Sequence, residues 1–296
     1  MRLVMMLSVA LAATAPAADR PKPQRTILVF GAHADDVEQI AGGTFAKYIR
    51  ELKYKGVYGM AINNTAGNML SGSSQFSLSI VHTPQIFPAD ALETIQVRGE
   101  EARRAAAFFG ATPVFLNFRE PDYWQGRKDT DVDSEDFTRQ APPGRPTIGN
   151  ATRHRDDVEA VVEVLRQYQP EITIIHTLGG DKYDHGNAGY MMYLAFRRAI
   201  QTGIPVGKLW MVPGGWLREP EARENGRGKP DVVIDVTDYV ETMCRALNLH
   251  VSQNGGLKCK DFIQPGKKYY EEFITVIDNA TEKDRSQTGS KNLPPD

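Results

Sequence analysis

Residues 26–38 constrain the fold more than any other part of the chain. The first six, TILVFG, are mostly apolar and rich in β-branched side chains, which predicts a buried strand. The next seven, AHADDVE, place an imidazole and several carboxylates directly after that strand, and a helix is expected over residues 44–49, after Gly42-Gly43. In open α/β sheets, ligands bind at the edge where the strands end. This stretch therefore predicts a ligand site at the end of a central strand.

Strands and helices alternate along the rest of the chain. Strands are expected at residues 57–62, 113–116, 171–176, 209–212 and 232–236, and helices at residues 92–109, 156–168, 188–200 and 239–249. This alternation predicts an α/β fold in three layers, with a mostly parallel sheet covered by helices on both faces. Three segments without periodicity, at residues 68–92, 120–152 and 213–230, are expected to be long loops that shape a pocket.

The first residues have the pattern of an export signal. Arg2 precedes an apolar run over residues 3–13, and Ala15-Pro16-Ala17 forms a small-residue cleavage site. The run is too short to span a bilayer comfortably, so no stable membrane anchor is expected. We predict a signal peptide over residues 1–17, a single domain over residues 18–278 and a polar tail over residues 279–296, in a secreted or periplasmic protein.

Charge and cysteine content narrow the class of protein further. The chain has 296 residues, a formal net charge of −2 and no basic run, so nothing favours nucleic acid as a partner. Its two cysteines are Cys244 and Cys259. In an oxidising compartment they can form a disulfide, and otherwise they are two buried thiols. The sequence leaves both possibilities open.

Two clusters of polar residues follow strands at the same edge of the expected sheet. They are His33, Asp35 and Asp36 in the first turn, and Asp181, Asp184 and His185 in the second. Two histidines and one carboxylate, with positions left for water, form a catalytic Zn²⁺ site, and a spare carboxylate can serve as general base. Either cluster alone can be a solvated acidic turn, and for an isolated His-x-x-Asp pattern that is the better explanation. Both together favour a metal site.

Several motifs in this order resemble a known family. They are HADDVE at residues 33–38, GGT at residues 42–44, RGEEA at residues 98–102, Asp184-His185, and HVSQ at residues 250–253. In order and spacing, residues 26–253 are similar to the LmbE/PIG-L family of zinc-dependent N-deacetylases. The resemblance implies a Rossmann-like fold and the removal of an N-acyl group from a small amino-sugar or glycoconjugate substrate.

The resemblance also implies roles for individual residues. Zn²⁺ would be bound by His33, Asp36 and His185, and Asp35 would be the general base for the attacking water. Arg98 matches a substrate-contacting arginine, and Asp122 falls where the family often has a pocket aspartate. From the residues alone, Arg98 is equally well explained by an ion pair on a helix surface with Glu100 or Glu101.

Two positions depart from the family pattern. Ala34 replaces a proline, and Lys182 replaces the first histidine of the second motif, which is thought to stabilise the oxyanion. A lysine ammonium can do this electrostatically, but with its usual pKa it is a poor proton donor at neutral pH. His176 or Tyr183 can substitute, although His176 and His250 are equally well explained as structural residues.

Two functions from different classes remain. The first is an exported zinc hydrolase that removes an acyl group from an amino sugar, with Asp35 and Lys182 as its catalytic residues. The alternative is an exported metal- or glycan-binding protein of the same fold that has lost turnover. A nucleotide-binding Rossmann domain is disfavoured, because the first turn has carboxylates and no G-x-G-x-x-G pattern.

Overall fold

A computed structural model describes residues 24–62, 91–119, 146–178, 183–213, 230–254, 257–279 and 283–284. The expected signal peptide, Asp122 and Lys182 lie outside these residues. The strands are β1 (Thr26–Gly31), β2 (Lys55–Ile62), β3 (Ala111–Phe118), β4 (Ile172–Ile175), β5 (Lys208–Met211), β6 (Val232–Asp235), β7 (Tyr270–Asp278) and β8 (Lys283–Asp284). The helices are α1 (Asp36–Arg50), α2 (Ala91–Phe109), α4 (Ile148–Ala151), α5 (Arg155–Tyr168), α6 (Tyr183–Gln201), α8 (Val240–Leu247), α9 (Val251–Asn254) and α10 (Cys259–Phe262), with a 3₁₀ turn, η4 (Thr237–Tyr239).

The strands form one sheet in the order β3-β2-β1-β4-β5-β7-β6, with β8 beside β7. Strands β3, β2, β1, β4 and β5 are parallel to one another, whereas β7 is antiparallel to β5, β6 and β8. The mostly parallel α/β fold expected from the sequence is therefore confirmed. The direction of winding reverses between β1 and β4, and this is the position at which open α/β sheets bind ligands.

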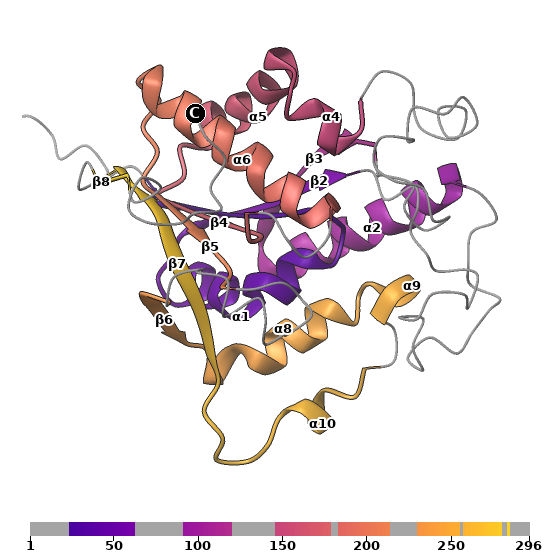
Figure 1. Cartoon of the computed structure of the whole chain (residues 1–296). Coiled ribbons are helices and arrows are strands. Elements are labelled where there is room, and N and C mark those ends of the chain that lie inside the picture. Colours follow the sequence, from indigo (N-terminus) through magenta and orange to yellow (C-terminus); the bar gives the residue numbers. More distant parts are fainter. Residues whose placement is uncertain are drawn as a thin grey trace, which may run out of the picture.

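Helices cover both faces of the sheet (Figure 1). Leu28 and Phe30 of β1 pack into a core formed with α5 and α6, whereas Ile27 and Val29 pack into a second core formed with α1 and α2. Every residue of β1 is buried, which explains why its sequence is a continuous apolar run rather than an alternating one. The strand that carries the ligand turn is thus fixed by packing on both sides.

Helix α1 begins earlier than the sequence suggested, at Asp36 instead of near Thr44. The helix is interrupted at Ala41, where φ is −158° and ψ is 24°. The amides of Gly43 and Thr44, which follow the break, donate to the carboxylate of Glu271 on β7 at 2.9 and 2.7 Å. That carboxylate caps the second half of the helix, as a side chain caps an ordinary helix start.

The glycines at the break allow close packing of neighbouring segments against α1. A Cβ on Gly42 would lie 2.6 Å from Met243 of α8, and one on Gly43 would lie 2.7 Å from Val236. Helix α8 at Gly42 and Val236 at Gly43 can therefore approach α1 closely only because these positions lack side chains.

The C-terminal part of the sheet was predicted incompletely. The expected strand at residues 232–236 is β6, but it lies at the sheet edge and pairs with β7, which the sequence analysis missed. Two residues of the expected polar tail form β8 and pair with Ile277 and Asp278. Among the described residues, no helix has both the length and the apolar character needed to cross a bilayer.

The two cysteines form a disulfide. Cys244 on α8 and Cys259 on α10 have Cα atoms 5.7 Å apart, within the usual range for this bond. Of the two possibilities left open by the sequence, the structure therefore has the cross-link. The disulfide closes a loop of the chain that contains His250 and Ser252.

Replacing Cys244 with serine should lower the free energy of unfolding by about 3 kcal/mol, because the cross-link closes a loop of about 15 residues. Urea unfolding under oxidising conditions measures this loss. Reductant should bring the wild type to the same midpoint and leave Cys244→Ser unchanged. Equal midpoints for the oxidised wild type and the variant would contradict the prediction.

Candidate metal centre and active site

The turn between β1 and α1 is closed by one of its own carboxylates. Asp36 Oδ2 accepts a hydrogen bond from the backbone N–H of His33 at 2.6 Å. Gly31 is required at the end of β1, because a Cβ there would lie 2.6 Å from the Cβ of Asp36. His33 and Asp36 are both buried. The turn therefore holds an imidazole and a carboxylate in a fixed relation at the edge of the sheet.

The first turn of α6 brings a second imidazole to the same point. His33 Nδ1 lies 3.2 Å from His185 Nε2 and 3.4 Å from Asp36 Oδ2, and His185 Nε2 lies 3.5 Å from Asp36 Oδ1. Tetrahedral Zn²⁺ with bonds of 2.0 to 2.1 Å requires ligand atoms about 3.3 Å apart. The three residues that the family resemblance assigns to zinc are thus brought together at spacings that fit this ion.

Two further buried residues, Asp184 and His176, contact the candidate ligands. Asp184 Oδ2 lies 3.1 Å from His33 Nε2, so Nδ1 is the nitrogen that His33 turns toward Asp36 and His185. His176 Nε2 lies 3.0 Å from Asp36 Oδ2, and its ring stacks on that of His185 with centroids 4.3 Å apart. Carboxylates and imidazoles in such positions fix the tautomer and orientation of metal ligands.

The sequence left the role of His176 open, and the structure places this residue beside the candidate ligands. Ligand atoms of His33, Asp184 and His185 lie within 4.8 Å of one another, and so do those of Asp36, His176 and His185. His176 is therefore close enough to influence the metal centre, through its contact with Asp36.

The protonation states of the cluster suit a cation. Burial alone would raise the pKa of Asp36, but His185 and His176 hold that pKa well below its usual value. Burial is the main cause that lowers the pKa of His185 to about 4. At neutral pH the cluster therefore offers an ionised carboxylate and a neutral imidazole, which are the forms that bind metals.

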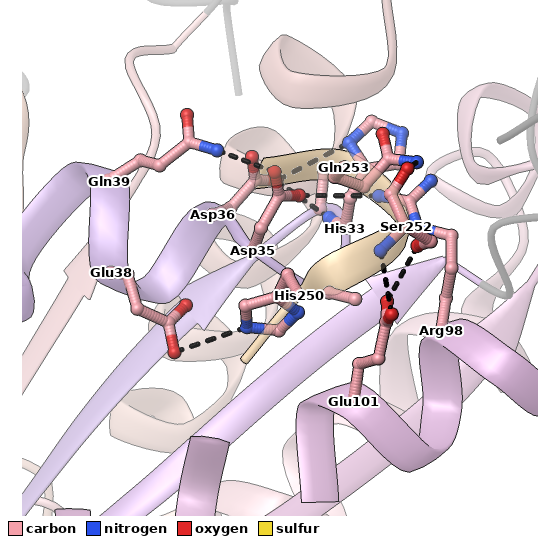
Figure 2. Close-up of polar contacts among 12 residues, drawn as sticks. His33, Asp35, Asp36, Glu38, Gln39, Arg98, Glu101, His250, Ser252 and Gln253 are labelled. Atoms are coloured by element: carbon pink, nitrogen blue, oxygen red, sulfur yellow. Dashed lines mark hydrogen bonds and ion pairs between the residues drawn. The ribbon is translucent and has the colours of Figure 1, made fainter. Parts of the chain in front are cut away.

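Asp35 is held separately from the candidate ligands, between two donors (Figure 2). Its Oδ1 accepts from Arg98 Nη2 at 3.2 Å, and its Oδ2 accepts from Gln39 Nε2 at 2.6 Å. Arg98 is buried, and Glu100 pairs instead with Arg104 at 3.2 Å. The interpretation of Arg98 as a surface ion-pair residue is therefore wrong.

A buried polar cluster lies beneath this turn. Glu38 Oε1 is 3.3 Å from His250 Nε2, the hydroxyl of Tyr58 is 2.9 Å from Glu38 Oε2, and all three side chains are fully buried. Tyr58 also contacts the carbonyl of Ala34, which ties the turn between β1 and α1 to β2. His250 thus supports the turn from below, as Figure 2 shows, and its Nε2 faces Glu38.

Glu38 and His250 shift each other's proton affinity. Burial raises the pKa of Glu38, against the opposing effect of His250. Burial alone would lower the pKa of His250, but Glu38, with smaller effects from Asp35 and Glu101, raises it overall. Relative to a free histidine, the pKa of His250 is therefore shifted in the direction that favours the charged imidazole.

The segment after His250 fixes the helix that carries Arg98. The backbone N–H and hydroxyl of Ser252 donate to the two carboxylate oxygens of Glu101, at 2.8 and 2.6 Å. Glu101 lies three residues after Arg98 on α2, so this contact sets the position from which Arg98 reaches Asp35. The HVSQ motif at residues 250–253 is therefore part of the framework of the site.

Sequence reasoning missed the supporting roles of Gln39, Tyr58 and Glu101. Only Gln39 had a usable signal, because it lies four residues after Asp35 and such pairs meet on a helix surface. Tyr58 and Glu101 reach the site from other elements, and no spacing in the sequence reveals this. Lys182 and Asp122, which the sequence analysis assigned to catalysis and substrate binding, lie outside the described residues.

Comparison with known proteins now places this arrangement in a family. The family model for GlcNAc-PI de-N-acetylase, PIG-L, matches residues 28–196, which is more than half of the chain and includes every candidate ligand. The chain belongs to the PIG-L family. The resemblance to this family stated from the motifs is thereby confirmed.

Solved structures share the fold of this PIG-L family member at low sequence identity. An N,N'-diacetylchitobiose deacetylase from Pyrococcus horikoshii is 16% identical with a TM-score of 0.54, over 86% of this chain and 84% of that one. A deacetylase of teicoplanin biosynthesis in complex with teicoplanin is 13% identical with a TM-score of 0.53, over 86% and 100%.

A third similar structure has a different activity. The 4-carboxy-2-hydroxymuconate hydratase of Pseudomonas putida is 20% identical with a TM-score of 0.52, over 86% of this chain and 96% of that one. A fold that occurs in deacetylases and in a hydratase does not specify the reaction. The activity has to be argued from the site.

Replacing Asp184 with asparagine should lower the affinity for Zn²⁺ by about 10- to 100-fold, because the substitution removes the carboxylate that orients His33. Competition with a chromophoric chelator measures the affinity. Asp156→Asn, at an exposed position on α5, is the matched control and should not change it. Unaltered zinc binding by Asp184→Asn would rule out the orienting role.

Replacing His250 with glutamine should destabilise the protein in a pH-dependent way. A raised folded-state pKa means that the charged imidazole contributes fully below its ordinary value of about 6.5, and that the contribution disappears as pH rises through the raised pKa. The loss of unfolding free energy should therefore be larger near pH 6 than near pH 9. Urea titrations at both pH values test this, and equal losses would contradict it.

Proposed function

We propose that this protein is a zinc-dependent hydrolase that removes the N-acyl group from an amino-sugar-type substrate. One observation carries the proposal: His33, Asp36 and His185 lie at zinc-ligand spacings, and Asp35 lies beside them on the same turn. Membership of a de-N-acetylase family supports the reaction class. Small-molecule N-acyl amino sugars or glycoconjugates are the proposed partners.

In this proposal, some residues around the ion bind it and others position or transfer protons. When bound, Zn²⁺ makes water more acidic and polarises the carbonyl of the amide. Asp35 accepts a proton from the attacking water and later passes it to the nitrogen of the leaving amine, as the C–N bond breaks. Arg98 and Gln39 keep the carboxylate of Asp35 in place.

Two roles in the proposal belong to residues outside the described part of the chain. Lys182, which follows β4 in the sequence, would stabilise the oxyanion by its charge. Asp122 would bind substrate together with Arg98. Both assignments rest on positions in the motifs of the family.

We also propose that the protein is exported, to the periplasm or to the outside of the cell. The pattern of residues 1–17 supports this, and so does the disulfide between Cys244 and Cys259, since such bonds persist in oxidising compartments.

The activity is tested by replacing Asp35 with asparagine, which keeps the shape of the side chain and removes the base. The zinc-loaded variant should retain one ion per chain and lose at least about 100-fold in amine release from N-acetylated amino sugars. Elemental analysis measures the metal, and a fluorogenic amine assay measures turnover. Asp156→Asn serves as the exposed control and should keep full activity.

Two results would decide against the proposal. Full activity of Asp35→Asn would exclude Asp35 as the base. A wild type that binds zinc but releases no amine from a broad panel, with or without chelator, would favour the alternative of a metal- or glycan-binding protein without turnover.

A further inference from the structure

Gln39 lies one helical turn after Asp35 and reaches back to it. Side chains on a helix lean toward its N-terminus, so the carboxamide of Gln39 covers the start of α1, where Asp35 is the N-cap residue. The N-terminus of α1 is at the edge of the sheet that carries the candidate metal ligands. Gln39 is therefore a residue of the site itself, although no motif drew attention to it.

The contact with Asp35 fixes which way the carboxamide points. An ionised carboxylate accepts hydrogen bonds and donates none, so only the amide nitrogen of Gln39 can face it. The distance from Gln39 Nε2 to Asp35 Oδ2 is 2.6 Å. The carbonyl oxygen must then lie on the other side, and Figure 2 shows it turned away from Asp35.

Within the described part of the chain, that oxygen has no hydrogen-bond partner: Gln39 Oε1 is buried and accepts from none of those residues. On the opposite side of Asp35, Arg98 Nε is also buried and has no partner among the described residues. An unsatisfied acceptor and an unsatisfied donor thus flank the proposed base, and buried groups of this kind normally have a partner.

We propose that Gln39 is a specificity-determining residue whose carbonyl oxygen accepts a hydrogen bond from a substrate hydroxyl next to the N-acyl group. This rests on the proposed function. An acceptor beside a carboxylate requires a donor, and in an amino sugar the hydroxyls on the carbons adjacent to the N-acyl-bearing carbon are the donors nearest to the reacting amide. Through its nitrogen, the same carboxamide holds Asp35.

The test compares N-acetylglucosamine with its 1-deoxy and 3-deoxy analogues in wild type and in Gln39→Leu. In wild type, removing the hydroxyl that Gln39 binds should lower kcat/KM by about 2- to 12-fold, the effect of one neutral hydrogen bond. In Gln39→Leu, that analogue and the parent sugar should be used equally well. Such a cycle isolates the pair, because loss of Asp35 positioning affects both sugars alike.

A second variant and a second measurement are included so that the result does not depend on Gln39→Leu or on turnover alone. Gln39→Met keeps an unbranched side chain, and calorimetric affinities of the zinc-loaded proteins for the same sugars give the ratio where turnover is slow. Gln167→Leu, an exposed glutamine on α5, should behave like wild type.

Each outcome of these experiments either supports the role of Gln39 or contradicts a stated proposal. Loss of the discrimination in both Gln39 variants supports the inference. Equal discrimination in wild type and variants, or none in an active wild type, overturns it. A wild type that releases no amine from any of the sugars contradicts the proposed function instead.

Discussion

The site depends on one buried carboxylate, that of Asp36, at the junction of β1 and α1. An ionised carboxylate is costly to bury unless it is paired and hydrogen-bonded. Here the backbone N–H of His33 and the imidazole of His176 lie within 3.0 Å of Oδ2, and His185 lies on the side of Oδ1. The contacts that stabilise Asp36 therefore also assemble the candidate metal centre.

The surrounding framework keeps this junction in place from below and from the side. Beneath the turn, Glu38, Tyr58 and His250 form a buried polar cluster, and beside it the pairing of Ser252 with Glu101 positions Arg98. The disulfide closes the segment that supplies both His250 and Ser252. Residues more than 150 positions apart in the sequence thus support the turn between β1 and α1 and, through Arg98, the carboxylate of Asp35.

Much of the fold and of the candidate site could be predicted from the sequence, because these parts follow from local residue patterns. The apolar run of β1 and the polar turn after it located the ligand edge, and strand–helix alternation implied that His185 would reach the same edge. Strand β7 was missed because residues 254–278 gave no recognised pattern, and α1 was started too late because the helix was expected only after Gly42 and Gly43. Those glycines instead make room for Met243 and Val236, contacts that no local pattern encodes.

The most direct test of the account is the position of the metal itself. Anomalous diffraction at the zinc edge from zinc-loaded crystals should show one ion within about 2.1 Å of His33 Nδ1, His185 Nε2 and a carboxylate oxygen of Asp36. Asp184 should be hydrogen-bonded to His33 Nε2 in the same crystals. A zinc ion bound elsewhere, or bound through His33 Nε2, would contradict the account.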